Sequence, residues 1–280
     1  MAELSRTAVS GNDWSENELL AYRITSESIP PIQFFSTPMP SLDQLDPALL
    51  TASLPMVTID RNLSKNTIDY LLYLQVAAYG DEMRRKGYID NFARETLRLT
   101  GFFGPNNIVA TQYPIPLTIC GETCETAQTV VCIVYRPVII LLVLVPDSPF
   151  PNGTDAAAQA IAGAIAAFQF NNRSRESRGL APLQLMTIPC ITTSGTCPTF
   201  YLVPVSQDLN VAVATGQYPS TQTNVLKCVP LLSDIAANQQ SDSIGMENTE
   251  YRKHALQCFL AFRTLAQRYW TEIVEGVHNI

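Results

Sequence analysis

The sequence contains few charged residues, and their balance has the wrong sign for binding nucleic acid. Only 15% of its 280 residues are charged, and 18 basic against 25 acidic side chains give a net charge of -7. A negative chain repels a phosphate backbone, so nucleic acid is disfavoured as a partner. The local basic groups at 84–86 and 173–178 are interpreted as solvated helix faces.

Long apolar runs are also missing. The first twenty residues lack the apolar core of a signal peptide, and the longest apolar stretch, Val138 to Val145, is too short to span a bilayer. These absences predict an intracellular protein, cytoplasmic or nuclear, with no membrane partner. Hydrophobic residues make up 46% of the chain, which is sufficient for a large core.

Histidine is scarce, and the cysteines follow neither a disulfide nor a zinc pattern. The two histidines, His254 and His278, lie near the end of the chain, and the seven cysteines are an odd number. Cys120 and Cys124 have a plausible ligand spacing, but no second pair matches it. We therefore expect reduced, buried thiols and no metal or other cofactor. A nucleophile at Cys120, Cys124 or Tyr135 has little support, because no histidine is near in sequence.

Prolines punctuate residues 1–60 and exclude a long helix there. We expect this segment to be an irregular arm that packs on the rest of the protein through its aromatic and leucine side chains. The composition of residues 61–280 does not shift enough to mark two cores. The sequence therefore predicts an arm at 1–60 and a single domain at 61–280.

Hydrophobic periodicity predicts four helices and five strands after the arm. Asn171 and Asn172 are expected to end the third helix, and residues 213–246 to form a mobile loop. The order indicates an α/β (α+β) fold with a central mixed sheet flanked by helices and a C-terminal helix. The predicted helices are 67–79, 90–100, 155–170 and 251–274, and the strands are 115–120, 127–135, 138–145, 183–191 and 199–205.

Six short motifs in a fixed order cover nearly the whole chain. They resemble a family of basidiomycete proteins built on the PD-(D/E)XK nuclease-like core, in which helices flank a sheet that begins with a three-stranded meander. Each motif alone is weak, but their number and order make the resemblance specific. They are WxENELLAY at Trp14–Tyr22, IPLxICGE at Ile115–Glu122, AIAAFQxNNR at Ala164–Arg173, PTFYxxPV at Pro198–Val205, GQYP at Gly216–Pro219 and QCFxAF at Gln257–Phe262.

The resemblance implies a metal site whose residues have been replaced. In active members of the fold, an acid at the second strand and an E-x-K at the third hold a divalent cation and activate water. The resemblance places Val130 at the first acid, Pro146 at the glutamate and Ser148 at the lysine. Asp147 alone remains acidic, and one carboxylate binds magnesium poorly, so we expect a pseudo-nuclease without a resting metal.

Other acids could regroup with Asp147, namely Glu95, Glu122 and Glu125. The simpler interpretation makes Glu95 a solvent-facing helical residue and Glu122 and Glu125 parts of a charged hairpin turn.

Three further residues are candidates for lining the cleft. Gln159 and Gln169 lie on the helix after the third strand, and Tyr135 ends the second strand. Each glutamine either lines the cleft or is a structural polar residue at a buried end of the helix, and the sequence leaves both alternatives open.

These patterns allow three functions. We expect a non-catalytic binding protein whose partner is a protein, a peptide or a small apolar ligand. An enzyme of different chemistry in the same cleft is an alternative. A nuclease with migrated ligands is another, but Arg94 or Arg98 would then have to replace the lysine, and arginine cannot serve as the base.

Overall fold

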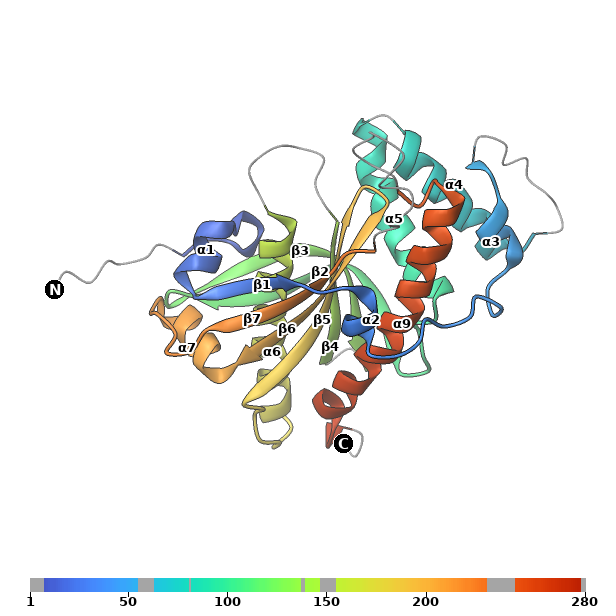
Figure 1. Ribbon diagram of the computed structural model, residues 1–280. Coiled ribbons are helices and arrows are strands. Elements are labelled where there is room, and N and C mark those ends of the chain that lie inside the picture. Colours follow the sequence, from blue (N-terminus) through green and yellow to red (C-terminus); the bar gives the residue numbers. More distant parts are fainter. Residues whose placement is uncertain are drawn as a thin grey trace.

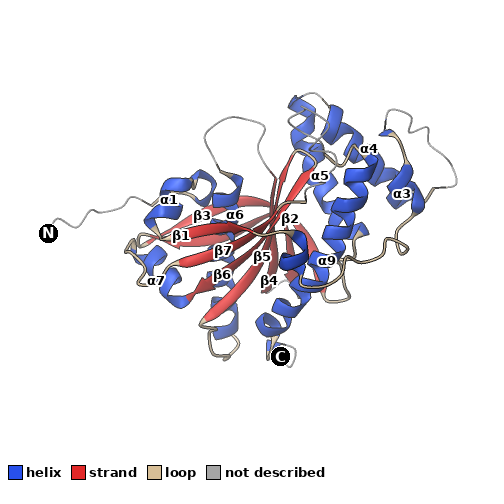
Figure 2. Cartoon of the chain, viewed as in Figure 1, coloured by secondary structure: helices blue, strands red, loops and turns tan. Residues whose placement is uncertain are grey.

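The computed structural model describes residues 8–54, 63–80, 82–136, 139–146, 155–230 and 245–277 (Figure 1). Within these ranges, a seven-stranded mixed sheet has the order β1-β7-β6-β5-β4-β3-β2. Helices cover both faces of the sheet (Figure 2). The predicted fold class, a mixed sheet flanked by helices, is confirmed.

The centre of the sheet is a meander followed by a crossover. β2 (Asn107–Ile119), β3 (Glu122–Tyr135) and β4 (Ile139–Pro146) pair antiparallel in succession. The chain then passes through α6 (Ala156–Glu176) to β5 (Leu185–Ser194), which is parallel to β4. β6 (Cys197–Ser206) returns antiparallel to β5. Residues 139–145 of β4 are all buried, because helices cover this central strand on both faces.

Two short strands were missed from the sequence. β7 (Thr223–Cys228) pairs antiparallel with β6, and β1 (Ile24–Ser28) pairs parallel with β7 at the edge of the sheet. The prediction of a loop over 213–246 is therefore wrong for β7, and that of an irregular arm is wrong for β1. Only the first residue of β1 is buried, so the strand lacks the apolar alternation that would have identified it.

The helices form a layer on each side of the sheet. α6 covers one face, where η1 (Gly11–Asp13) and α1 (Glu16–Ala21) also contact it. α9 (Thr249–Val274), α5 (Glu82–Leu99) and α2 (Pro31–Phe35) pack on the other side. α4 (Lys65–Tyr79) packs on α5, α3 (Pro47–Thr51) on α9, and α7 (Gln207–Thr215) on β6. None of the described helices combines the length and apolar character that crossing a membrane requires.

The side chain of Asn171 on α6 makes hydrogen bonds to the backbone of β4. Its Oδ1 accepts from the backbone N–H of Ile140 at 2.7 Å, and its Nδ2 donates to the carbonyl of Ile140 at 2.9 Å. The next residue, Leu141, is an extra residue between the β3–β4 pairs, and its carbonyl accepts from Trp270 Nε1 at 2.7 Å. Two side chains from opposite layers thus satisfy backbone groups of β4 at this irregularity.

The carboxamides of two neighbouring residues each make the same pair of hydrogen bonds to a single backbone residue. Asn172 accepts from the backbone N–H of Leu183 at 2.9 Å and donates to its carbonyl at 3.0 Å. Gln169 accepts from the N–H of Thr118 at 2.7 Å and donates to its carbonyl at 3.0 Å. The prediction that two asparagines end this helix is wrong, because their side chains bond to other elements and leave the helical backbone bonds intact.

We expect Asn171→Leu to lower the free energy of unfolding by about 2–4 kcal/mol, because both polar groups of a buried backbone residue then lose their partner. Urea denaturation measures the loss. Asn224→Leu, the same substitution at an exposed position on β7, is the matched control and should cost less than about 1 kcal/mol. Equal losses in the two variants would contradict the role given to Asn171.

Candidate functional site

The resemblance placed a lost metal site at one end of the sheet. Pairing of Val131 with Leu144 brings the backbone of the adjoining Val130 to this end, and Pro146 pairs with Thr193 of β5. The side chains of Val130 and Pro146 lie outside the described part of the structure. Asp147 and Ser148 lie outside it entirely.

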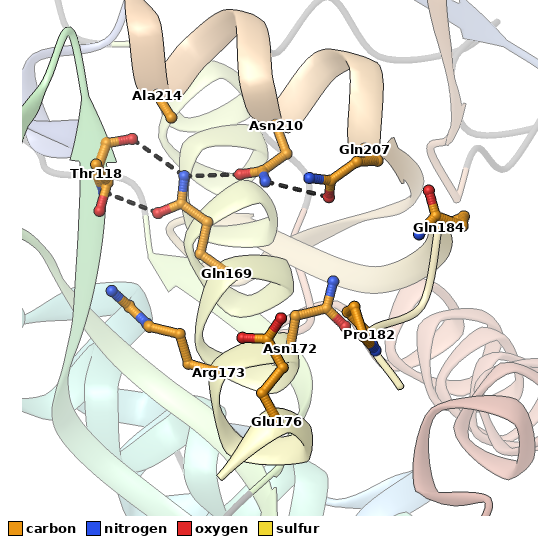
Figure 3. Close-up of a pocket in the computed structure, with 10 residues that line it drawn as sticks. All are labelled: Thr118, Gln169, Asn172, Arg173, Glu176, Pro182, Gln184, Gln207, Asn210 and Ala214. Carbon is orange, nitrogen blue, oxygen red and sulfur yellow. Dashed lines mark hydrogen bonds between the residues drawn. The ribbon is translucent and has the colours of Figure 1, made fainter. Parts of the chain in front are cut away.

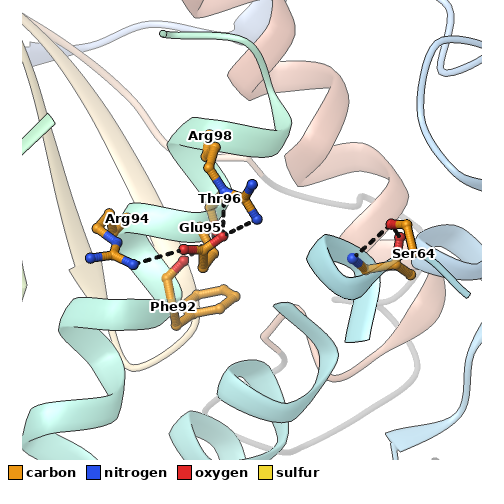
Figure 4. A network of polar contacts seen from close by, with 7 residues as sticks. Ser64, Phe92, Arg94, Glu95, Thr96 and Arg98 are labelled. Carbon is orange, nitrogen blue, oxygen red and sulfur yellow. Dashed lines mark hydrogen bonds and ion pairs between the residues drawn. The ribbon is translucent and has the colours of Figure 1, made fainter. Parts of the chain in front are cut away.

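Glu95 is bound in a double ion pair (Figure 4). Its carboxylate lies 3.2 Å from the guanidinium of Arg94 and 2.6 Å from that of Arg98. Only 4% of the residue is exposed, so its interpretation as a solvent-facing residue is wrong. The two arginines that the migrated-nuclease hypothesis needs are the ones that neutralise this acid.

Glu122 lies far from the degenerate positions. It is exposed at the start of β3 and pairs with Ile119 beside the β2–β3 turn, as its interpretation as a turn residue predicted. Eight residues of strand separate it from Val130, about 26 Å at 3.3 Å per residue. Over the residues that the structure describes, no three His, Cys, Asp or Glu side chains gather closely enough to hold a metal ion.

Gln159 holds the N-terminal arm. It lies in the first turns of α6, and its Nε2 donates to the carbonyl of Asn12 at 2.7 Å. The η1 segment that contains Asn12 contacts both α6 and β3. Behind it, Trp14 is fully buried and stacks on Tyr22 with ring centroids 5.6 Å apart. Gln159 therefore contacts the arm and makes a structural bond.

Gln169 forms the floor of a polar pocket of about 280 Å³ (Figure 3). Besides its two bonds to Thr118, its Nε2 donates to Asn210 Oδ1 at 2.9 Å, so its carboxamide is fully engaged. Gln169 is therefore a structural polar residue, and it also faces a pocket. We call this cavity the polar pocket; it is lined by Thr118, Gln169, Asn172, Arg173, Glu176, Pro182, Gln184, Gln207, Asn210 and Ala214.

Tyr135 ends β3, where it pairs with Ile139 at the opposite end of β4 from Pro146, and it lines a different cavity of about 380 Å³. Phe102 and Trp270 form its walls, with ring centroids 6.3 Å apart and an interplanar angle of 62°. We call this cavity the aromatic pocket; it is lined by Phe102, Phe103, Gly104, Pro105, Asn106, Asn107, Tyr135, Leu141, Gln267, Trp270, Thr271 and Val274.

The structure shows a cysteine–histidine pair that the sequence analysis missed. Cys258 Sγ lies 3.9 Å from His254 Nε2, one turn apart on α9, and this spacing of four residues could have been recognised. Burial raises the pKa of the Cys258 thiol and lowers that of His254, so both are neutral near pH 7. A neutral buried thiol is a poor nucleophile, and the pair does not support a cysteine enzyme.

No protein-family model and no curated protein matches the sequence. The assignment of a nuclease-like core therefore rests on the motif resemblance alone.

The buried thiols predict a loss of stability in alkali. Burial raises the pKa of Cys132 to about 12, whereas an unfolded cysteine titrates near about 8.5. Above a pH of about 8.5 the thiol of Cys132 loses its proton in the unfolded state but keeps it in the folded state. The free energy of unfolding should therefore fall by up to about 1.4 kcal/mol per pH unit for this thiol, and the loss should continue until the pH approaches 12.

Urea denaturation between pH 7 and 10.5 tests this, with Cys132→Ala as the comparison. The variant should be less stable than wild type at pH 7 and should lose stability less steeply above pH 8.5. Parallel pH profiles for the two proteins would contradict the assignment.

Proposed function

We propose that this chain is a non-catalytic binding protein on a degenerate nuclease-like fold. The meander, the crossover helix and the parallel fifth strand occur in the order that such a core uses. The motif resemblance puts Val130 and Pro146 where that core would carry two acids.

The observation that carries the proposal is the setting of the two candidate acids that the structure describes, Glu95 and Glu122. Glu95 is neutralised by two arginines on its own helix. Glu122 begins β3, eight residues before Val130. A metal-dependent nuclease needs its carboxylates within reach of the same cation, and among the described residues no three His, Cys, Asp or Glu side chains gather in this way.

The aromatic pocket is the binding site that we propose. Cavities that bind small molecules are typically of this size, with apolar and aromatic walls and a few polar groups. Among its described lining residues none is charged, and three carboxamides, those of Asn106, Asn107 and Gln267, supply hydrogen bonds. These features suit an uncharged molecule that carries polar groups beside a ring able to pack against Phe102 and Trp270.

We expect the purified protein to bind the uncharged fluorescent probe N-phenyl-1-naphthylamine at a single saturable site. Thr271→Arg places a long charged side chain at the aromatic pocket and should weaken binding at least about tenfold, equivalent to about 1.4 kcal/mol. Thr264→Arg is the matched control. Both threonines are exposed on α9 and donate to the carbonyl four residues earlier, but Thr264 does not line the pocket.

Equal probe affinity in all three proteins would exclude the aromatic pocket as the site. The non-catalytic part of the proposal is tested separately. Supercoiled DNA and single-stranded RNA should remain intact with the protein in Mg²⁺ or Mn²⁺, and cleavage that Glu95→Gln abolishes would overturn it.

A further inference from the structure

The polar pocket lies on the α6 side of the sheet, away from the aromatic pocket, and it differs from that pocket in charge. Gln169, Asn172, Arg173 and Glu176 are spaced by three or four residues and form one stripe of α6. Gln207 and Asn210 of α7 and Gln184 before β5 lie across from this stripe (Figure 3).

Arg173 and Glu176 bring opposite charges to the same cavity without pairing. They stand three residues apart on a helix, a spacing that allows an ion pair, yet the described structure shows none between them within 4 Å. One reason is that Arg173 Nη2 donates to the carbonyl of Pro116 on β2 at 3.2 Å, which directs the guanidinium toward that strand. Glu176 is exposed, and no described side chain donates to it. Both charges therefore remain available to a ligand.

A chain of carboxamides gives the opposite wall a defined polarity. Gln169 is fixed by Thr118 and donates to Asn210 at 2.9 Å, and Asn210 Nδ2 donates in turn to Gln207 Oε1 at 3.3 Å. Because Gln207 accepts at its oxygen, its Nε2 is the free donor end of the chain. Within the described residues this group makes no hydrogen bond, so it can donate to a carbonyl oxygen in the cavity.

We propose that the polar pocket binds a free amino acid with a carboxamide side chain, glutamine or asparagine, as the zwitterion. Its carboxylate would pair with Arg173, its ammonium group with Glu176, and its side-chain carbonyl would accept from Gln207 Nε2. The volume of about 280 Å³ corresponds to roughly nine water molecules at about 30 Å³ each, and glutamine has about ten heavy atoms. The inference is independent of the function assigned to the aromatic pocket.

Isothermal titration of the full chain with L-glutamine and L-asparagine tests the proposal. At least one of them should bind saturably, and Arg173→Gln and Glu176→Gln should each weaken that binding at least about tenfold. Arg178→Gln is the matched control, because this arginine lies on the same segment, bonds to Ser174 and does not line the pocket. Its affinity should equal that of the wild type.

Three ligand analogues separate the contacts. N-acetyl-glutamine lacks the ammonium group, glutaminamide lacks the carboxylate, and norvaline lacks the side-chain amide, so each should bind more weakly than glutamine. N-acetyl-glutamine should also not distinguish Glu176→Gln from wild type. Thermal melts establish that the variants are folded, and Glu176→Gln removes no bond in the described structure. Absence of saturable heat with both amino acids, or equal affinities across the variants, would overturn the proposal.

Discussion

The arrangement of the sheet around α6 depends on hydrogen bonds from carboxamide side chains of this helix. These side chains pair with backbone N–H and carbonyl groups in the way that a neighbouring strand would. Asn171, Asn172 and Gln169 each satisfy the N–H and the carbonyl of one residue, on β4, before β5 and on β2 respectively. A buried backbone group without a partner costs as much as a lost hydrogen bond. One helix thereby fixes the positions of three separate parts of the chain. The alanine-rich first half of the same helix lies close against the sheet and adds apolar contact.

The contacts that stabilise the fold do not involve the residues of a metal site. The sheet and its flanking helices are held by packing and by backbone hydrogen bonds, which do not require the acids of a metal site. The polar side chains at the expected cleft have structural partners instead: Gln159 holds the arm, Gln169 holds β2, and Glu95 is balanced by arginines. Neither the aromatic pocket nor the polar pocket includes Val130 or Pro146 among its lining residues.

The sequence predicted the parts of the fold that strong apolar patterns determine. The apolar run 138–145 predicted the strand that the structure shows as β4, and the predicted helix 155–170 is the main part of α6. β1 was missed because only its first residue is buried, and β7 because its buried residues do not form a continuous apolar run. Their place in the sheet comes from pairing between segments about 200 residues apart, which local patterns do not contain.

Site residues were harder to predict, because the role of a polar side chain depends on what lies opposite it. Asn171 and Asn172 have the composition of a helix end, and only the adjacent backbone of Ile140 and Leu183 makes them interior residues. Burial of Glu95 could not be read from its helix alone. The grouping of Arg173 and Glu176 with Gln207 needs α7 to pack beside α6, which no motif indicated.

The most direct test of this account is native-state hydrogen exchange at the backbone amide of Ile140. Its N–H donates to a side-chain oxygen, that of Asn171, at 2.7 Å. If the carboxamide acts as a structural partner, this amide should exchange only through global unfolding, with protection close to the full free energy of unfolding, as at the centre of β4. Exchange orders of magnitude faster, through local fluctuation, would contradict the claim that α6 holds the sheet in this way.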